Sequence, residues 1–193
     1  MTPDDSEVDD AELMHRSGAG DEAAFGTLVE RHQLRVIGTV AKMLGSPEGA
    51  EDIAQHVFVR VWQSASRYRH SAKFTTWLLT ITRNLVFNEI RRRQRARWVP
   101  MEHEDGSPME FADPGAPDAA RESEKRELQE AIDRAIASLP DQQRLAVILR
   151  RYEEMPYDEI AAVLGTSVSS VKSLLFRARE DLRTQLAAFL QDA

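Results

Sequence analysis

Apolar residues recur three and four positions apart along nearly the whole chain, and this spacing limits the fold more than any other feature. In residues 21–44 and again in residues 73–95, the apolar side chains fall on one face of a helix. No segment of useful length alternates apolar and polar residues as a half-buried strand would. The sequence therefore predicts an all-α protein, in which Gly45 ends one helix and Ser46-Pro47 begins the next.

Residues 98–125 interrupt this periodicity. They are rich in acidic residues and contain four prolines together with Gly106 and Gly115, which indicates a flexible linker. The chain then divides into an acidic N-terminal tail (1–8), a first helical domain (9–97), the linker (98–125) and a second helical domain (126–193). We expect two small helical domains, the second containing a helix-turn-helix.

Charge is unevenly distributed along the chain. Residues 23–97 contain thirteen basic and five acidic residues, a net charge of +8, although the net charge of the whole chain is −7. A basic block in an acidic protein favours a surface that binds a polyanion such as nucleic acid. The alternative at this point is an ordinary solvated helix face on which arginines are scattered.

The helix-turn-helix is predicted at residues 157–177. Ala161 is small where two crossing helices would approach closely, and Gly165 follows four residues later, where the chain must turn with positive φ. Apolar residues then mark the inner faces of both helices, namely Ile160, Leu164, Val171 and Leu175. In this motif the second helix enters the DNA major groove. A helical hairpin with a solvated outer face is the structural alternative.

The outer face of the second helix carries short hydroxyl side chains and cations. The hydroxyl residues let the backbone approach base edges, while Lys172 and Arg177 have the length to reach guanine or phosphate. The predicted duplex-binding residues are Ser167, Ser169, Ser170, Lys172, Ser173, Phe176, Arg177 and Arg179.

Four segments together resemble an extracytoplasmic-function RNA polymerase sigma factor. The resemblance lies in residues 20–25, in 50–62, in Phe74-Thr75-Thr76-Trp77-Leu78 through the arginine cluster 91–97, and in residues 139–179. It implies two helical domains that bind core RNA polymerase through its β′ clamp and β subunits. The first would capture the −10 element and the second would read the −35 element of promoter DNA. It also implies a cytoplasmic protein that an anti-sigma factor restrains.

The resemblance also assigns residues to two sites in the first domain. The predicted polymerase-binding residues are Asp52, Gln55, His56 and Arg60. The predicted −10 residues are Arg67, Tyr68, Arg69, His70, Lys73, Asn84, Asn88, Arg91 and Arg92. Two positions depart from the family pattern, because His56 replaces an acid and Leu174 replaces an arginine in the recognition helix. We interpret Trp62 and Trp77 as core anchors and Tyr68 as the aromatic residue that faces DNA.

Other functions fit the sequence less well. The chain has no cysteine, and its histidines lack metal-ligand spacing, so we expect no metal, no cofactor and no thiol chemistry. No apolar run approaches the ~20 residues of a membrane helix, so we expect no membrane insertion. No carboxylate cluster or activated nucleophile suggests an enzyme. The remaining alternative is a helix-turn-helix regulator that is not a polymerase subunit, which would leave the first domain without a role.

Overall fold

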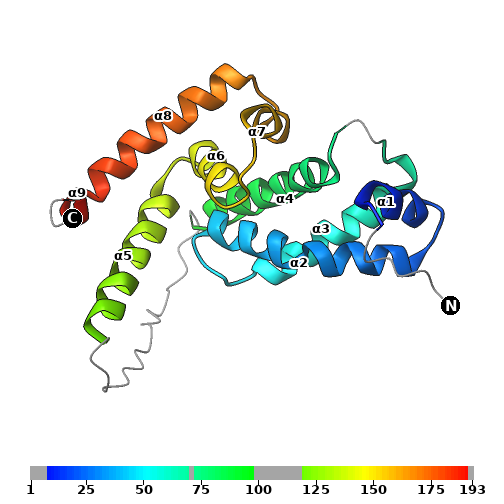
Figure 1. The fold of residues 1–193 in the computed structure, drawn as a ribbon, viewed down its shortest axis with the longest axis horizontal. Helices are drawn as coiled ribbons and strands as arrows, with labels where there is room; N and C mark the ends of the chain where they lie inside the picture. The colour runs from blue at the N-terminus through cyan, green and yellow to red at the C-terminus, as the bar shows by residue number, and fades with distance from the viewer. Residues whose placement is uncertain (1–7, 70–71, 98–118, 191–193) are drawn as a thin grey trace.

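The computed structural model describes residues 8–69, 72–97 and 119–190, and the regular elements within these ranges are helices (Figure 1). Among the described residues, those before position 98 form four α-helices and a short 3-10 helix, and those after position 118 form five α-helices. The elements are α1 (Asp10–Gly18), α2 (Glu22–Leu44), α3 (Ala50–Ser64), η2 (Ala65–Arg67), α4 (Phe74–Arg97), α5 (Ala119–Ser138), α6 (Asp141–Arg151), α7 (Tyr157–Leu164), α8 (Val168–Gln185) and α9 (Ala187–Leu190). The predicted all-α fold is confirmed.

Helix α2 has the ends that the sequence predicts. Asp21 precedes it, and its carboxylate accepts a hydrogen bond of 3.0 Å from the backbone N–H of Ala24. Gly45 follows it with φ of 74° and ends it in the left-handed conformation. The next helix differs from prediction. Ser46-Pro47 lies in a turn, and α3 begins at Ala50 because Gly49 has a positive φ that a continuous helix excludes.

Helix α1 is fastened to α2 by a charged cluster. The Asp10 carboxylate forms an ion pair with the guanidinium of Arg31, with a nitrogen–oxygen distance of 2.8 Å. Its second oxygen lies 2.7 Å from the Nε2 atom of His32. His32 itself is 6% exposed, and its ring lies 5.2 Å from that of Phe74. Burial acts to raise the pKa of Asp10, but the hydrogen bonds from His32 and Arg31 outweigh it, and the pKa is lowered from 3.8.

We expect Asp10→Asn to lower the free energy of unfolding at pH 7 by about 1–2 kcal/mol, because it removes two charge-assisted hydrogen bonds. A carboxyl whose pKa is lowered by folding stabilises the protein above its unfolded pKa, and that contribution disappears as the pH falls through the folded value. The difference between wild type and variant should therefore shrink below about pH 4. Urea titrations at pH 7 and pH 3 measure it, and a difference that stays constant would contradict the assignment.

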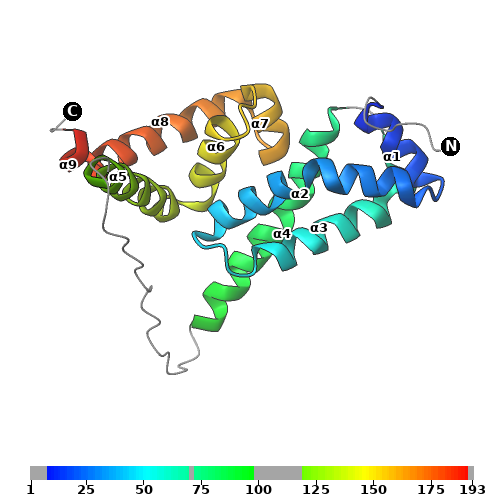
Figure 2. The same cartoon turned by 60° about the horizontal axis from the view of Figure 1, so that its bottom comes forward.

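The second half begins earlier in the chain than the sequence suggests. Helix α5 starts at Ala119, inside the segment 98–125 that we interpret as a linker, and residues 98–118 lie outside the described residues. Helices α5, α6 and α8 pack together, and α7 crosses from α6 to α8 (Figures 1 and 2). Leu145 and Ile148 are fully or almost fully buried in this half.

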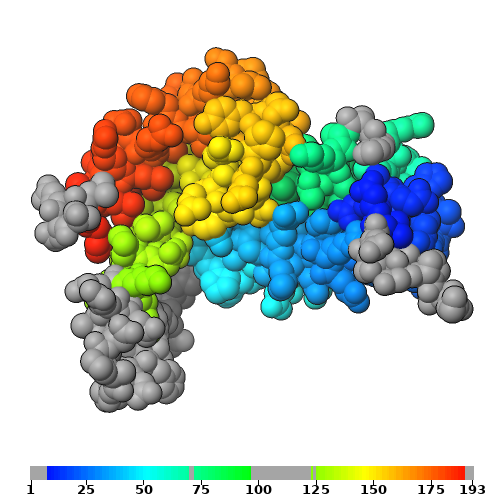
Figure 3. Space-filling model, viewed as in Figure 1, coloured from blue at the N-terminus to red at the C-terminus, as the bar shows by residue number. Residues whose placement is uncertain are grey.

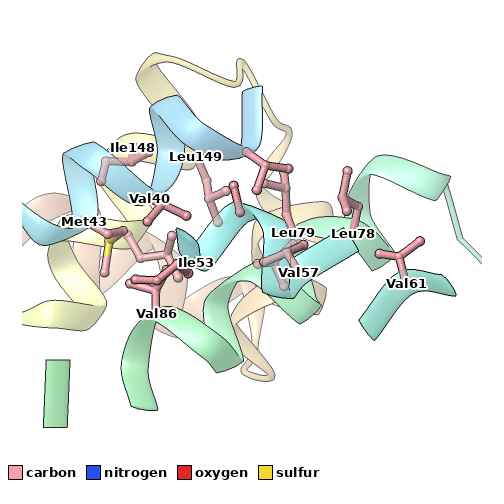
Figure 4. Close-up of a cluster of buried hydrophobic side chains, with 14 of the residues drawn as sticks. Val40, Met43, Ile53, Val57, Val61, Leu78, Leu79, Val86, Ile148 and Leu149 are labelled. Carbon is pink, nitrogen blue, oxygen red and sulfur yellow. The ribbon is translucent and has the colours of Figure 1, made fainter. Parts of the chain in front are cut away.

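The two halves share one core, which the sequence does not reveal. Val40 and Met43 of α2 lie beside Ile148 and Leu149 of α6 in the same buried cluster (Figure 4). The space-filling view shows the second half seated directly on α2 and α4 (Figure 3). The expectation of two helical units is confirmed, but in this arrangement they are packed against each other.

Within residues 8–69, 72–97 and 119–190, no group of three or more histidine, cysteine or acidic side chains is placed to hold a metal ion. Within the same ranges, no single helix has the length and apolar character needed to cross a membrane. Among the described helices, α7 and α8 would be long and apolar enough if taken as one segment, but they are bent by 96° relative to each other.

Candidate nucleic-acid interface

Helices α7 and α8 form the predicted helix-turn-helix. Gly165 lies between them with φ of 65°, and the two helices meet at an angle of 96°. Ala161, 6% exposed, is buried at this crossing. Ser167 then begins α8, and its hydroxyl accepts a hydrogen bond of 3.1 Å from the backbone N–H of Ser170. The buried side of α8 includes Val171, so the opposite side is left for a partner.

The predicted duplex-binding residues are all exposed. Phe176 is 62% exposed, although an aromatic side chain of this size is usually buried. The hydroxyl of Ser173 donates to the carbonyl of Ser169 at 3.1 Å, which turns it back along the helix. Arg179 differs from the others because it lines a groove between α5, α6 and α8. The exposed set is Ser167, Ser169, Ser170, Lys172, Ser173, Phe176, Arg177 and Arg179.

Leu174 lies at the border of the buried stripe of α8. It is partly buried, as is its neighbour Leu175, whereas Val171 one turn earlier is fully buried. We expect Leu174→Arg to keep the fold and to add roughly one phosphate contact, which increases the slope of log K against log salt by about one. Val171→Arg is the matched control and should unfold the protein, because it buries a guanidinium in the core.

Thermal denaturation and salt-dependent DNA binding of the full chain check both variants. If Leu174→Arg lowers the melting temperature as much as Val171→Arg does, Leu174 belongs to the core and the predicted phosphate contact is wrong. If it leaves both stability and the salt slope unchanged, position 174 lies too far from the phosphates.

In the first half, the predicted −10 residues lie on α4 and on the segment before it. Tyr68 is partly buried beside Trp77, with ring centroids 5.0 Å apart, and its hydroxyl is buried without a hydrogen-bond partner. Burial raises the pKa of this hydroxyl. Tyr68 is thus part of an aromatic cluster with Trp77 and Phe74, and the interpretation of Trp77 as an anchor agrees with its position. The exposed members are Arg67, Arg69, Lys73, Asn84, Asn88, Arg91 and Arg92, and His70 lies outside the described residues.

A basic strip follows the junction of α3 and α4. One depression is lined by Arg60, Arg67, Trp77 and Ile81, together with Gln63 and Ser64. A second, further along α4, is lined by residues that include His56, Asn88, Arg92 and Arg95. The strip therefore brings His56 and Arg60, predicted for polymerase, next to residues predicted for the −10 element.

Glu89 moderates the charge of this strip. Its carboxylate accepts from the Nε atoms of Arg92 at 2.7 Å and Arg93 at 2.8 Å. The hydrogen bond from Arg92 is the largest cause that lowers the pKa of Glu89 to about 2. Glu89 is therefore ionised at neutral pH and holds Arg92 at a defined position next to Asn88.

A neighbouring face of α3 carries an apolar groove that it shares with α2, and Gln63 lines both this groove and the first depression. Gln55 lines this groove, whereas Asp52 is exposed on the preceding turn. Trp62 is 36% exposed at the groove, and its ring packs on that of Phe25 at 4.9 Å. The apolar lining consists of Phe25, Val29, Ile37, Ala54, Phe58, Val59 and Trp62.

Sequence reasoning missed this groove. Trp62 was interpreted as a core anchor, yet it is a surface residue that covers Phe25. The sequence does contain a sign of this groove, because α3 has more apolar residues than one buried stripe needs. Ile53, Val57 and Val61 are buried, and Val59, which is 50% exposed, falls on another face. Exposed apolar patches of this kind mark interaction surfaces.

Comparison with known proteins places both halves of the chain. Residues 28–96 match the family model Sigma-70 region 2, and residues 129–182 match the model Sigma-70, region 4. The RNA polymerase sigma-H factor of Pseudomonas aeruginosa is 30% identical over 189 residues, which cover 95% of this chain and 97% of the relative.

Two further proteins are similar to this chain over most of its length. The ECF RNA polymerase sigma factor SigW of Bacillus subtilis is 33% identical over 172 residues, covering 86% of this chain and 91% of the relative. The solved structure of CnrH in complex with the cytosolic domain of CnrY superposes with a TM-score of 0.67 at 27% identity, covering 93% of this chain and 97% of CnrH. The chain therefore belongs to the RNA polymerase sigma factors of the extracytoplasmic-function (ECF) type.

Proposed function

We propose that this protein binds core RNA polymerase and directs it to promoters by recognising their −10 and −35 elements. The observation that carries this function is the order of two units in one chain. A sigma-70 region 2 unit at residues 28–96 precedes a region 4 unit at 129–182, and the second contains the exposed helix-turn-helix. The role needs binding surfaces and no catalytic residue, so we propose a non-enzymatic protein.

Three surfaces of the protein would bind the polymerase, the −10 element and the −35 element respectively. The apolar α2–α3 groove, with Gln55 on its lining and Asp52 nearby, would bind the polymerase β′ clamp. The basic strip between α3 and α4 would hold the separated −10 strand, because cations beside aromatic and amide groups suit unstacked bases. The exposed face of α8 would read the −35 duplex in the major groove. The proposed functional domains remain residues 9–97 and 126–193.

The partners follow from the same family. CnrH, which this chain resembles over nearly its full length, was solved with the cytosolic domain of CnrY. We propose that this chain likewise has a regulatory protein partner, an anti-sigma factor, and that it acts in the cytoplasm, where RNA polymerase works. Promoter DNA and the polymerase β′ and β subunits complete the set of partners.

Run-off transcription with core polymerase on a library of random promoters tests the proposal and reveals the recognised motif. A sigma factor yields transcripts that start at a fixed distance from two enriched elements. A regulator that is not a polymerase subunit would bind DNA in the same library without producing transcripts or co-purifying with polymerase, and that outcome would contradict the proposal.

Replacing Asn84 and Asn88 together with alanine should reduce open-complex formation at least about ten-fold, since amide contacts to bases contribute ~1–3 kcal/mol each. Both side chains are exposed on α4, so stability and polymerase binding should be unchanged. Permanganate footprinting of melted thymines measures the effect. Gln94→Ala, an exposed amide further along the same helix, is the matched control. Normal melting in the double variant would show that the −10 strand lies elsewhere.

A further inference from the structure

The second depression of the basic strip, here called the α3–α4 depression, has a volume of about 340 Å³. This is at the lower end of the range of about 300–1,000 Å³ in which small-ligand pockets fall. Part of its wall is apolar, because Ile53 is 9% exposed and Leu85 is partly buried. The other lining residues are polar or charged, namely His56, Asn88, Glu89, Arg92 and Arg95. The depression therefore suits a ligand that has both an apolar and an anionic part.

The charged groups of the α3–α4 depression leave an excess of positive charge. The carboxylate of Glu89 is already paired with Arg92 at 2.7 Å and with Arg93 at 2.8 Å. His56 and Arg95 are exposed, and neither forms an ion pair with another residue that the structure describes. Their free donors can therefore bind an anion. Because a guanidinium matches the oxygens of a phosphate in its geometry, phosphate is the anion that this set of side chains suits best.

His56 and its neighbour Gln55 face different surfaces. Successive residues of an α-helix point about 100° apart, so the two side chains leave α3 in different directions. Gln55 lines the α2–α3 groove, whereas His56 lines the α3–α4 depression. A carboxylate at position 56, the residue type that His56 replaces, would lie beside Arg92 and Arg95 and compensate their charge. The histidine of this chain leaves that charge available to a ligand.

Asn88 gives the α3–α4 depression a side chain that can distinguish bases. Its amide both donates and accepts hydrogen bonds, as the edge of an unstacked base does. Asn88 follows Leu85 by three residues and precedes Arg92 by four, so these three side chains share one face of α4. An apolar wall, an amide and free cations thus meet in one depression. The sugar, base and phosphate of a nucleotide need these three kinds of contact.

We propose that the α3–α4 depression is a subsite for one nucleotide of the separated −10 strand, in which His56 and Arg95 bind the phosphate and Asn88 contacts the base edge. The inference rests on the proposed sigma function. It makes His56 a DNA-binding residue, on a face of α3 other than the one that lines the α2–α3 groove. Glu89 is a positioning residue of this subsite, because its ion pair holds Arg92 beside Asn88.

Charge reversal at position 56 separates DNA binding from polymerase binding. His56→Glu should weaken open-complex formation by about three- to ten-fold, because an attraction to phosphate becomes a repulsion. It should also flatten the slope of log K against log salt by about 0.7, the value for one single-strand phosphate. Permanganate footprinting on the promoter found by run-off transcription measures both, at protein concentrations that saturate core polymerase. Affinity for core polymerase should equal that of wild type, and His56→Arg, which keeps a cation, should form open complexes normally.

Gln94→Glu is the matched control, because it adds a negative charge at an exposed position of α4 that does not line the α3–α4 depression. It should leave open-complex formation and the salt slope close to those of wild type. Equal effects of Gln94→Glu and His56→Glu would overturn the subsite, and so would lost polymerase affinity in His56→Glu with normal open-complex formation. Absence of transcription by wild type would instead overturn the proposed sigma function, and this inference with it.

A scan with uncharged phosphates identifies the nucleotide that the depression binds. Methylphosphonate linkages, each of which removes the charge of one phosphate, are placed one at a time along the −10 strand of the same promoter. At the linkage that His56 contacts, the difference in open-complex formation between wild type and His56→Glu should disappear, whereas it should persist at the other linkages. A difference that persists at every linkage would overturn the subsite.

Discussion

Replacing Trp62 with alanine is expected to weaken binding to core RNA polymerase by at least about thirty-fold, equivalent to ~2 kcal/mol. Trp62 is a large side chain at the α2–α3 groove, supported from below by Phe25. Aromatic anchors of this kind contribute most of the binding energy at protein interfaces, because they bury a large area with little loss of conformational entropy. Affinity for core polymerase, measured with the full chain, tests the expectation.

The control for Trp62 is Leu34→Ala on α2. Leu34 is 78% exposed, more so than Trp62, and it is not part of the groove lining. It should therefore have little effect on polymerase affinity. Circular dichroism of both variants separates lost binding from lost folding. Equal, small effects of the two substitutions in folded proteins would show that the groove is not the polymerase surface.

Leu149→Ala is expected to destabilise the protein by about 2–5 kcal/mol, the range for a large-to-small change in a packed core. Leu149 is fully buried in the cluster that α6 shares with α2. All three tryptophans of the chain, Trp62, Trp77 and Trp98, precede residue 119, whereas Leu149 lies in the second half. Because the halves share a core, the midpoint of the tryptophan fluorescence transition in urea should fall together with that of the helical signal.

Val147→Ala on the same helix is the matched control. Val147 is only partly buried and faces the groove between α5, α6 and α8, so its truncation should cost less than about 1 kcal/mol. If Leu149→Ala lowers the helical transition but leaves the tryptophan transition unchanged, the two halves unfold independently. The shared core would then contribute little to stability in solution.

The helix-turn-helix, the exposed face of α8 and the ends of α2 could be predicted from the sequence, because each depends on residues that are close together in the chain. A helix-turn-helix needs a small residue at the crossing and a residue that tolerates positive φ at the turn, and Ala161 and Gly165 meet both needs within a few positions. The exposed face of α8 follows from the same short segment, because helical periodicity fixes which side chains oppose Val171. Likewise the carboxylate of Asp21 and the positive φ of Gly45 mark the ends of α2.

The interpretation of Trp62 as a core anchor was wrong, because one periodic stripe does not show that α3 has two occupied faces. Helix α3 buries Val57 against the core and presents Trp62 to the α2–α3 groove, while His56 and Arg60 reach the basic strip on the side of α4. The family resemblance assigns Asp52, Gln55, His56 and Arg60 to polymerase binding, and this assignment stays a prediction. Which of them line the groove and which line the basic strip depends on where α2 and α4 pack, and residue spacing along α3 does not determine it.

The sequence by itself determined the helices, the division into two units and the recognition helix, because caps, turns and periodicity act over a few residues. Only the tertiary structure decided that Glu159 meets Lys73, that Arg83 meets the end of α7, and that Leu149 completes a core begun by α2. These pairs lie far apart in the chain, and their contact depends on how whole helices dock. Docking is decided by the summed burial of apolar surface, a property of the assembled fold that no local pattern carries.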